Sequence, residues 1–337
     1  MHSLLPVCIY QQNSNMNDIE IETFEMSDGN TFDERYTIGH VLGEGGFAKV
    51  YAGMRNRDSL PVAVKLIKKV DLNLDSKRLP LEVRLMHRLS HIKGVVKLID
   101  ACYLARCLII VMEREENSMD LSSFIEMYEL TPELTRSVFR QLVETVIECH
   151  RAGVVHRDIK PDNILINTST DTIKLIDFGC GSIFTEFQIS FEGTEAYQPP
   201  ELYRNGYCRS VSSTIWSLGV TLYVLTVNKF PYYDICELEK LDAEDIKFPA
   251  EVPKQCQDLV RSLLKFDHRE RPSLEQILLH PYLRTQSSVL MGYSFMVVKK
   301  YFSYISSVLN PALEMLVRHG CRNRESLPLL IIAYLCL

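Results

Sequence analysis

The sequence lacks the features of several protein classes. Its ten cysteines never form a C-x-x-C pair, and they are scattered over the whole chain. This spacing argues against zinc and favours reduced, structural thiols in a cytoplasmic or nuclear protein. Residues 1–6 contain neither a basic segment nor a sustained apolar run, so no secretory signal is expected. No run of lysine and arginine is dense enough to separate nuclear from cytoplasmic residence.

Long hydrophobic runs are also absent. The apolar segments 212–227 and 327–337 are too short for a helix that spans a bilayer, and Lys299 and Lys300 interrupt the apolar stretch between them. We predict that residues 212–227 form a buried central helix, and we do not expect a membrane anchor. The tail, residues 286–337, is predicted either to dock on the C-terminal lobe or to be an atypical end with no stable packing.

Negative charge is in modest excess. The net charge is −6, but residues 287–337 carry five basic and two acidic side chains, so residues 1–286 carry −9. An acidic body argues against a nucleic-acid surface and is compatible with basic peptide substrates. Solvated acidic faces are common, so the charge alone does not decide between these readings.

The composition that is present is that of an ordinary globular protein, with 46% apolar and 24% charged residues. A chain of 337 residues is long enough for two lobes with separate cores. Residues 1–34 are polar and acidic, and we predict that they form a mobile arm.

A short polar loop, residues 156–163, stands between two apolar runs and reads H-R-D-I-K-P-D-N. It places a candidate base, a candidate phosphate counter-charge and a candidate metal ligand within one turn of chain. This H-R-D-x-x-x-x-N pattern is typical of phosphoryl transfer. The assignment depends on whether the other parts of such a site occur in the right order.

The first such part is a glycine-rich turn between two β-type runs, residues 36–42 and 49–54. This turn, called the lid here, covers residues 43–50 and reads G-E-G-G-F-A-K-V. Glycines allow backbone N–H groups to approach phosphate oxygens without a Cβ in the way. A hairpin of this kind is more often only a turn, and Ala48 replaces the third glycine of G-x-G-x-x-G. Because alanine is the smallest replacement, we expect the lid to work with less freedom.

The next part is a strand, residues 61–67, that contains V-A-V-K and places Lys65 where a lysine grips the α- and β-phosphates. A lone lysine at a strand end is more often a surface residue. A helix follows at residues 79–89, with an apolar stripe and with Glu82 beside it. We predict that Glu82 pairs with Lys65; the alternative is a solvent-facing charge. The stripe consists of Leu81, Leu85, Met86 and Leu89.

The remaining elements continue the series. Residues 113–117, called the hinge here, follow a buried strand, and their backbone would meet an adenine edge. D-F-G at residues 177–179 follows Asn163 by fourteen positions and offers Asp177 as a metal ligand on a movable segment. Arg271 is predicted to pair with Glu201 of P-P-E. Further strands are predicted at 95–103, 107–112, 164–166 and 173–176, and helices at 131–153, 256–264 and 273–279, with Thr131 and Ser273 as N-caps.

These parts together resemble a eukaryotic protein kinase from about residue 36 to about residue 283. The resemblance implies an α+β, bilobal fold, with an N-lobe and hinge at 35–114 and a C-lobe at 115–285. Lys160 marks the serine/threonine version of the loop. Within this class the chain is similar to the PIM family, on residues 42–47, 60–65, 80–83, 113–114, 174–179, 199–201 and 215–219. Thr214 stands where most kinases have an aspartate, which PIM kinases also lack.

The resemblance implies ATP and Mg²⁺ as cofactors and transfer of the γ-phosphoryl group to Ser or Thr. Asp158 would accept the hydroxyl proton, Lys160 would neutralise the transferring group, and Thr194 would bridge both to the substrate platform. Asn163 and Asp177 would hold the metal. The nucleotide site would comprise Leu42, Gly43, Glu44, Gly45, Gly46, Phe47, Ala48, Val50, Ala63, Lys65, Met112, Glu113, Glu115, Leu165 and Asp177, with Glu82 positioning Lys65.

Departures from the PIM pattern carry further expectations. Glu115 stands where PIM hinges carry a proline, so a second hinge N–H should be available to adenine. Asp120 and Asp162 match acidic positions of the peptide groove, whereas Ser123 and Pro161 replace two others. We therefore expect a weakened preference for basic residues near the target Ser or Thr.

Activity without phosphorylation of the activation loop, residues 180–198, is implied as well. Glu192 would supply a fixed negative charge, paired with Arg157, and Ser190 is a candidate phosphosite. Cys180 is either a reactive thiol or a small buried hydrophobe.

A second class of function fits part of the pattern. Ala48 and the unusual tail would suit a pseudokinase, a nucleotide-binding or scaffold module with the same fold. The presence of Lys65, Glu82, Asp158 and the two metal ligands argues for the enzyme. A monomer is expected, with protein substrates and with neither nucleic acid nor membrane as partner.

Overall fold

The structure is a computed structural model, which describes seven stretches of the chain. These are 31–45, 48–68, 80–103, 107–128, 130–189, 192–232 and 243–284. The predictions for residues 1–30, Gly46, Phe47, Leu79, Ser190 and the tail lie outside the described residues.

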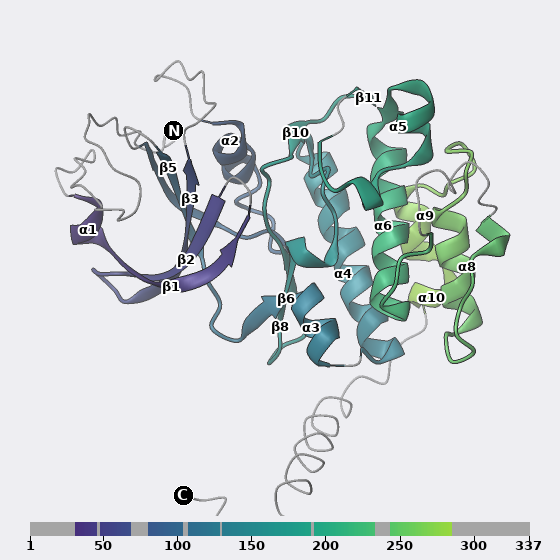
Figure 1. Cartoon of the computed structure of the whole chain (residues 1–337), viewed down its shortest axis with the longest axis horizontal. Helices are drawn as coiled ribbons and strands as arrows, with labels where there is room; N and C mark the ends of the chain where they lie inside the picture. Colours follow the sequence, from purple (N-terminus) through teal and green to yellow (C-terminus); the bar gives the residue numbers. More distant parts are fainter. Residues whose placement is uncertain are drawn as a thin grey trace, which may run out of the picture. The chain divides into compact units, whose positions relative to one another are not determined.

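The N-terminal region is a five-stranded antiparallel sheet (Figure 1) in the order β1-β2-β3-β5-β4. Val62 and Val64 of β3 are fully buried in the core, and Pro61 and Ala63, which precede them, are half-buried. This alternation is the period of two that a half-buried strand requires. The strands are β1 (Tyr36–Glu44), β2 (Ala48–Arg55), β3 (Leu60–Lys68), β4 (Leu98–Tyr103) and β5 (Cys107–Glu113).

A short helix, α1 (Phe32–Arg35), precedes the sheet. Thr31 and Glu34 form a reciprocal capping box, and Phe32 is fully buried in the same core as Val62 and Val64. The capping box satisfies two backbone donors, and the buried ring anchors the segment. The prediction of a mobile arm is therefore wrong for residues 31–34, because a single aromatic anchor lay hidden in a polar stretch.

Helix α2 (Leu81–Arg88) packs beside the sheet and buries Val83, Leu85 and Met86. Leu89 just beyond it is buried as predicted, but the predicted stripe is wrong at Leu81, which is 39% exposed. The buried face runs instead through Glu82, which is 8% exposed. A carboxylate replaces leucine at this end of the face because it meets a cation there, as described below.

The predicted strand at 95–103 begins later than expected, since β4 starts at Leu98. Val95 forms an isolated parallel bridge with Leu175, and Val96 N–H donates to Leu175 O at 3.1 Å. Leu175 N–H in turn donates to Gly94 O at 2.7 Å. Backbone hydrogen bonds therefore tie the N-terminal region to the strand that leads into D-F-G.

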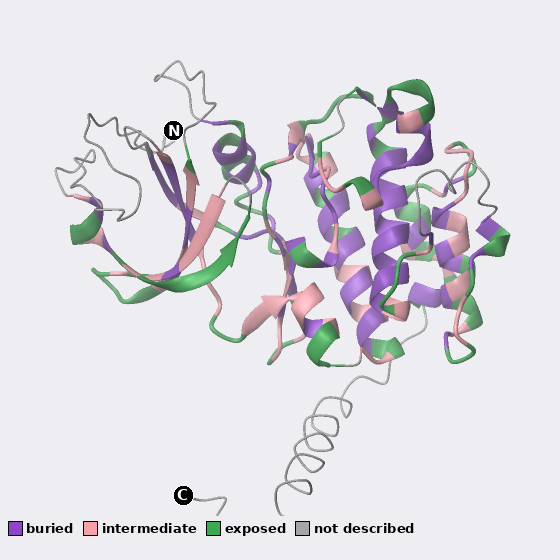
Figure 2. Ribbon diagram, viewed as in Figure 1, coloured by how far each residue is buried: buried purple, intermediate pink, exposed green. Residues whose placement is uncertain are grey.

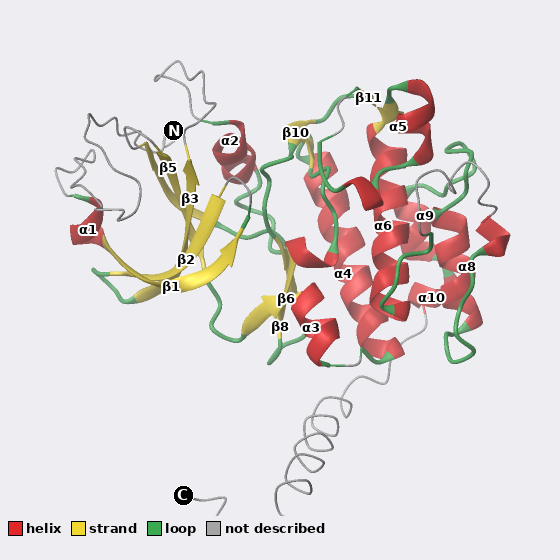
Figure 3. Ribbon diagram, viewed as in Figure 1, coloured by secondary structure: helices red, strands yellow, loops and turns green. Residues whose placement is uncertain are grey.

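The C-terminal region is mostly helical (Figure 3). Together with the N-terminal sheet it gives the predicted bilobal α+β arrangement. Its helices are α3 (Leu121–Met127), α4 (Pro132–Arg151), α5 (Pro200–Asn205), α6 (Ser210–Val227), α8 (Lys254–Leu263), α9 (Leu274–Leu279) and α10 (Pro281–Arg284). Its strands are β6 (Ser118–Asp120), β7 (Val154–Val155), β8 (Ile164–Asn167), β9 (Ile173–Leu175), β10 (Ser182–Ile183), β11 (Phe187–Gln188) and β12 (Cys208–Arg209).

The predicted central helix is α6, which Figure 2 shows buried along almost its whole length. Trp216, Leu218, Val220 and Leu222 are all fully buried. Among the described residues α6 is the one helix long and apolar enough to cross a membrane, and 83% of it is covered by the fold. A helix that is apolar all round is expected in such a core.

Helix starts follow their capping residues. Thr131 accepts a hydrogen bond from Leu134 N–H at 3.2 Å, and Pro132 occupies the first turn of α4. Ser273 and Gln276 form the predicted capping box of α9. These side chains satisfy backbone donors that a helix start otherwise leaves unpaired.

Candidate active site

The polar loop 156–163 closes around Asp158. Asn163 Nδ2 donates to both Asp158 O and Asp158 Oδ2 at 2.8 Å, and Thr194 N–H donates to Asp158 Oδ1 at 2.8 Å. Lys160 Nζ lies 3.1 Å from Asp158 Oδ2 and also donates to Thr194 Oγ1. The structure thus brings together four residues that the sequence predicted as parts of one site.

The environment of Asp158 keeps its carboxyl group ionised. Partial burial alone would raise its pKa, but hydrogen bonds from Thr194 and the charge of Lys160 outweigh burial and lower the pKa below its usual value. A carboxylate oriented in this way can accept a proton from a hydroxyl group within hydrogen-bond distance of it.

His156 sets the backbone of this loop. Its ring is fully buried; Nε2 lies 2.8 Å from Ile176 O, and Nδ1 accepts Asp158 N–H at 3.2 Å. Burial lowers the pKa of His156, which agrees with a neutral ring whose Nδ1 is an acceptor. The ring also packs edge-on against Phe178 at 4.7 Å between centroids. The sequence had assigned His156 no role of its own, although the first position of H-R-D was a signal for one.

Lys65 lies between two carboxylates. Its Nζ is 2.7 Å from Glu82 Oε1 and 2.8 Å from Asp177 Oδ1. Burial would lower the pKa of Lys65, but the two acids outweigh it and hold the pKa above its usual value. Burial raises the pKa of Glu82, an effect that the Lys65 charge opposes. The predicted pair of Lys65 and Glu82 is therefore present, and the solvent-facing alternative for Glu82 is wrong.

Asp177 adopts a left-handed backbone with φ of +60°, which is uncommon for a residue with a side chain. Gly179 N–H donates to Asp177 Oδ1 at 3.1 Å, and the following Phe178 is fully buried. Burial would raise the pKa of Asp177, but Lys65 outweighs it and lowers the pKa. Buried Phe178 and the Gly179 N–H thus hold the ionised carboxylate of Asp177 next to Lys65.

Asn163 and Asp177 fit a magnesium ion in their donor chemistry, since both offer oxygen atoms, which Mg²⁺ prefers. Asn163 Nδ2 donates its two hydrogen bonds to Asp158, whereas Asn163 Oδ1 accepts no hydrogen bond from the described residues. Ile176 N–H donates to Asn163 O at 2.9 Å, which joins the two segments that carry the candidate ligands.

The lid forms the predicted hairpin. Gly43 pairs with Val50 and Glu44 with Lys49 across β1 and β2, and an ion pair of 2.8 Å joins Glu44 to Lys49. Gly45 N–H donates to Ala48 O at 2.8 Å. Leu42, the residue before the lid, is 44% exposed. Ala48 therefore continues the hairpin without disrupting it.

The predicted adenine pocket draws on both lobes. Ala63 of β3 pairs with Met112 of β5, and Met112 is 8% exposed. Leu165 lies on β8 of the C-terminal region, opposite Asp120 and Lys174. The structure brings Ala63 and Met112 together; for Leu165 it gives the position on β8.

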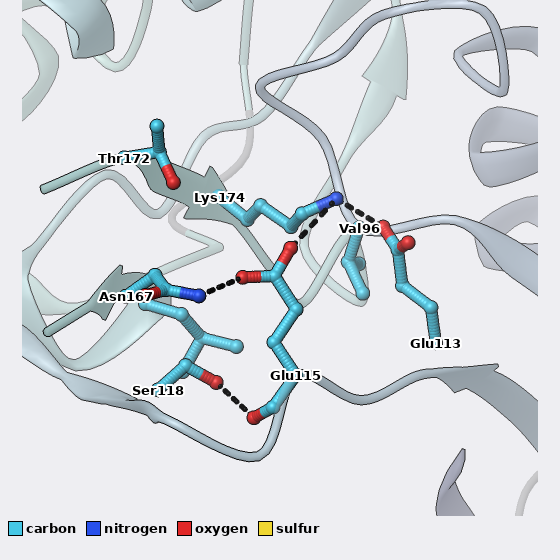
Figure 4. A pocket seen from close by; sticks show the side chains of 8 residues that line it. Val96, Glu113, Glu115, Ser118, Asn167, Thr172 and Lys174 are labelled. Carbon is cyan, nitrogen blue, oxygen red and sulfur yellow. Dashed lines mark hydrogen bonds and ion pairs between the residues drawn. The ribbon is translucent and has the colours of Figure 1, made fainter. Parts of the chain in front are cut away.

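Side chains of β8 and β9 contact the hinge (Figure 4). Lys174 Nζ lies 2.5 Å from Glu113 Oε1 and 3.4 Å from Glu115 Oε1. Asn167 Nδ2 donates to Glu115 Oε2 at 2.8 Å, and Ser118 Oγ donates to Glu115 O at 2.6 Å. The space between these side chains is about 10 Å³, room for about one water molecule. The Glu115 N–H donates to no atom of the described residues, so the expected free hinge donor stays a prediction.

The role of Asp120 in peptide binding stays a prediction, and the structure gives this residue a second role. Asp120 caps α3: its Oδ1 accepts Ser123 N–H at 2.7 Å and its Oδ2 accepts Ser123 Oγ at 2.8 Å. Asp162, in contrast, is exposed and lines a groove of about 380 Å³ that does not include Asp120. Ser123, which stands where the PIM pattern has an acid, therefore donates hydrogen bonds to both carboxylate oxygens of Asp120.

Two further predicted contacts are present. Arg157 Nη2 lies 3.0 Å from Glu192 Oε2. Arg271 grips Glu201 with two hydrogen bonds of 2.8 Å and is fully buried beneath the ring of Trp216.

Cys180 is half-buried, and burial raises its pKa, with Asp158, Asp177 and Glu192 adding to the effect. A raised pKa keeps the thiol protonated and disfavours the reactive alternative.

Comparisons with known proteins agree with this geometry. Residues 36–283 match the protein kinase domain family, and the chain belongs to that family. It is a serine/threonine protein kinase, as its relatives indicate.

Serine/threonine-protein kinase pim-2 of Danio rerio is 35% identical over 273 residues, which cover 76% of this chain and 87% of that protein. Serine/threonine-protein kinase prk-2 of Caenorhabditis elegans is 34% identical over 265 residues, 76% of this chain and 60% of that protein. Testis-specific serine/threonine-protein kinase 3 of Mus musculus is 30% identical, over 78% of this chain and 99% of that protein. The predicted family and the predicted enzyme class are confirmed.

Proposed function

We propose that this kinase transfers the γ-phosphoryl group of ATP, with Mg²⁺, to Ser or Thr hydroxyls in basic peptide contexts, without needing phosphorylation of its activation loop. The observation that carries this proposal is the set of hydrogen bonds that orient Asp158. It supplies a fixed, ionised base beside a cation, which is what hydroxyl activation and charge neutralisation require.

In this mechanism Asp158 orients the substrate hydroxyl and accepts its proton. Lys160, held by Asp158 and Thr194, neutralises charge on the group in transfer. Asn163 and Asp177 would hold the metal, which supplies charge stabilisation at the phosphates. Each group is positioned before the reaction, so little reorganisation is needed.

Lys65 positions the α- and β-phosphates, and Glu82 positions Lys65. The Lys65 bond to Asp177 brings the phosphate-binding cation next to the proposed metal ligand. The lid would cover the phosphates, while Ala63, Met112 and the hinge backbone would bind adenine on the N-lobe side.

Constitutive activity is supported by the ion pair of Arg157 and Glu192, a fixed carboxylate where a phosphate would otherwise be needed. A basic context is supported by the acidic body of the chain and by exposed Asp162. We further propose a monomer in the cytoplasm or the nucleus, with its kinase lobes at 35–114 and 115–285.

The test is phosphate transfer from Mg²⁺-ATP to a basic Ser-containing peptide. Asp158→Asn should lower kcat by about 10²- to 10⁴-fold, the usual contribution of a positioned base. Asp245→Asn, at an exposed acid remote from the loop, is the matched control and should retain full activity. Transfer that survives Asp158→Asn undiminished would remove the assigned base. Thermal stabilisation by nucleotide with no turnover in the wild-type chain would favour the pseudokinase.

A further inference from the structure

A groove of about 380 Å³ runs from α3 to the residues that follow α6. Both helices pack on the 3-10 turn Pro161–Asn163, which lies between them and contributes to the lining. The lining residues used below are Glu126, Asp162, Tyr197, Lys229 and Phe230. We call this surface the peptide groove.

The peptide groove is continuous with the catalytic loop. Lys160 and Thr194 belong to its lining, and both contact the carboxylate of Asp158. A substrate whose hydroxyl group reaches Asp158 must therefore place its flanking residues in or beside this groove. The occupant is accordingly the substrate peptide, and the lining side chains determine which flanking residues it accepts.

The groove carries charges of both signs. Glu126 of α3 and Asp162 are exposed acids, and Lys229 is an exposed base. Over the described ranges none of these three side chains forms an ion pair with another residue. Three charged groups without internal partners in one groove remain available to groups on a bound peptide.

Lys229 has an ordinary alternative role. It follows the C-terminus of α6, where Asn228 is the left-handed cap, and a cation is favoured near the carbonyl groups of a helix end. A lysine exposed to solvent would interact favourably with that helix end whichever way its side chain pointed. Here the side chain lines the groove next to Phe230, which is 44% exposed and packs edge-on against Tyr197 at 5.5 Å.

We infer that Lys229 selects an anionic side chain on the substrate, while Glu126 and Asp162 select a cationic one. The inference rests on the proposed function and narrows its substrate class: peptides that carry both a basic residue and an anionic residue near the acceptor Ser or Thr. The anion is a carboxylate or a phosphate. The exposed face of Phe230 favours an apolar residue beside it.

The experiment is a positional scan of Ser-containing peptides with the full-length kinase and Mg²⁺-ATP, in which each flanking position is varied among Lys, Ala, Glu and phosphoserine. The wild-type chain should favour Lys at one position and Glu or phosphoserine at another. Exposed ion pairs contribute little individually, so each preference should be about two- to fivefold in kcat/KM. The preference should weaken as salt rises.

Substitutions assign each preference to its residue. Lys229→Ala should abolish the preference for an anion, and Lys229→Glu should turn it into a preference for Lys at the same position. Glu126→Gln should reduce the preference for a basic residue and leave the anion preference intact. Lys254→Glu changes an exposed lysine outside the groove by the same charge and should leave the scan unchanged.

The outcomes separate this inference from the proposed function. If wild-type and Lys229→Glu chains phosphorylate peptides with the same scan, the inference is wrong while the kinase assignment stands. If the wild-type chain phosphorylates no peptide, the proposed function fails. Equal kcat/KM of wild-type and Lys229→Glu chains on a peptide with alanine at the anion position checks that the variant is folded. A greater response to phosphoserine than to Glu would identify a phosphorylated substrate, and equal responses would identify an acidic one.

Discussion

Arg157 Nη2 lies 3.0 Å from Glu192 Oε2, and this ion pair joins the catalytic loop to the activation loop. The Arg157 side chain is 10% exposed, and its backbone adopts the left-handed region with φ of +70°. Gly193 lies so close that a Cβ there would stand 2.4 Å from Arg157 O. A side chain at position 193 would push the two loops apart, so glycine is required for the approach.

The first prediction concerns this pair. Glu192→Gln should lower kcat by about two- to fivefold, because Glu192 is 57% exposed and a pair of this kind contributes modestly. Phosphatase treatment of the wild-type chain should leave the rate unchanged. Glu186→Gln is the control, since Glu186 forms an exposed ion pair with Arg209 on the same segment at 2.6 Å. A Glu192→Gln rate equal to that of wild type would contradict a role for the fixed charge.

The second prediction concerns the hinge. Lys174 is the cation shared by Glu113 and Glu115, and its loss would leave the two carboxylates facing one another. Lys174→Met should raise KM for ATP by roughly threefold or more and change kcat little, because the hinge positions the nucleotide and not the acceptor. Lys174→Arg should keep most of the affinity.

Steady-state kinetics with varied ATP provide the measurement. Lys254→Met removes an exposed lysine on α8, outside the hinge contacts, and should behave as wild type. An unchanged KM for ATP in Lys174→Met would show that the contacts behind the hinge do not position it.

The sequence was sufficient wherever a short motif specified both a residue type and a local structure. The pair of Lys65 and Glu82, the cap at Thr131 and the bond of Arg271 to Glu201 were all predictable, because each follows from a local pattern or a fixed order of motifs. The position of Asn163 next to Asp158 follows from their spacing within one loop.

Other features depended on tertiary contacts that no local pattern reveals. Phe32 was hidden in a polar stretch, and only the core below the sheet shows that it is an anchor. Asp120 is an exception, because the helix cap that it forms with Ser123 three residues later is a local pattern present in the sequence. The contact of Lys174 with Glu113 joins residues sixty-one positions apart, and the groove at Lys229 needs four separate segments to form.

The third prediction concerns stability. The Arg271 side chain is fully buried and that of Glu201 is 8% exposed. Arg271→Met should lower the free energy of unfolding by about 3–5 kcal/mol, because it leaves a buried carboxylate without its partner. Arg269→Met removes an arginine that is 79% exposed and paired with Asp267, and should cost far less, because solvent screens an exposed pair.

Urea unfolding of both variants provides the comparison. Adding Glu201→Leu to Arg271→Met should restore part of the loss, since the uncompensated charge is then absent. Equal losses in Arg271→Met and Arg269→Met would show that burial does not govern this pair.

The fourth prediction concerns pH. His150 is half-buried on α4, where its buried Nδ1 has no hydrogen-bond partner in the described part of the chain and Nε2 lies 3.4 Å from Thr214 Oγ1. Burial lowers the pKa of His150 to about 4, although the charge of Glu275 opposes the shift. The unfolded chain, with an ordinary pKa of about 6.5, therefore binds more protons than the folded chain in the interval between these two values.

Stability should accordingly be unaffected by this residue above pH of about 6.5 and fall as pH drops from there towards about 4, with a slope of up to about 1.4 kcal/mol per pH unit. His150→Phe removes the titrating group and should reduce that slope by up to about 1.4 kcal/mol per pH unit, the contribution of one proton. This holds whatever the substitution does to stability at neutral pH. His156, whose pKa burial also lowers, contributes to the slope in the same direction. Urea unfolding at several pH values measures it, with exposed His91→Phe as the control. A slope in His150→Phe equal to that of wild type would mean that His150 is not the group that resists protonation in the folded chain.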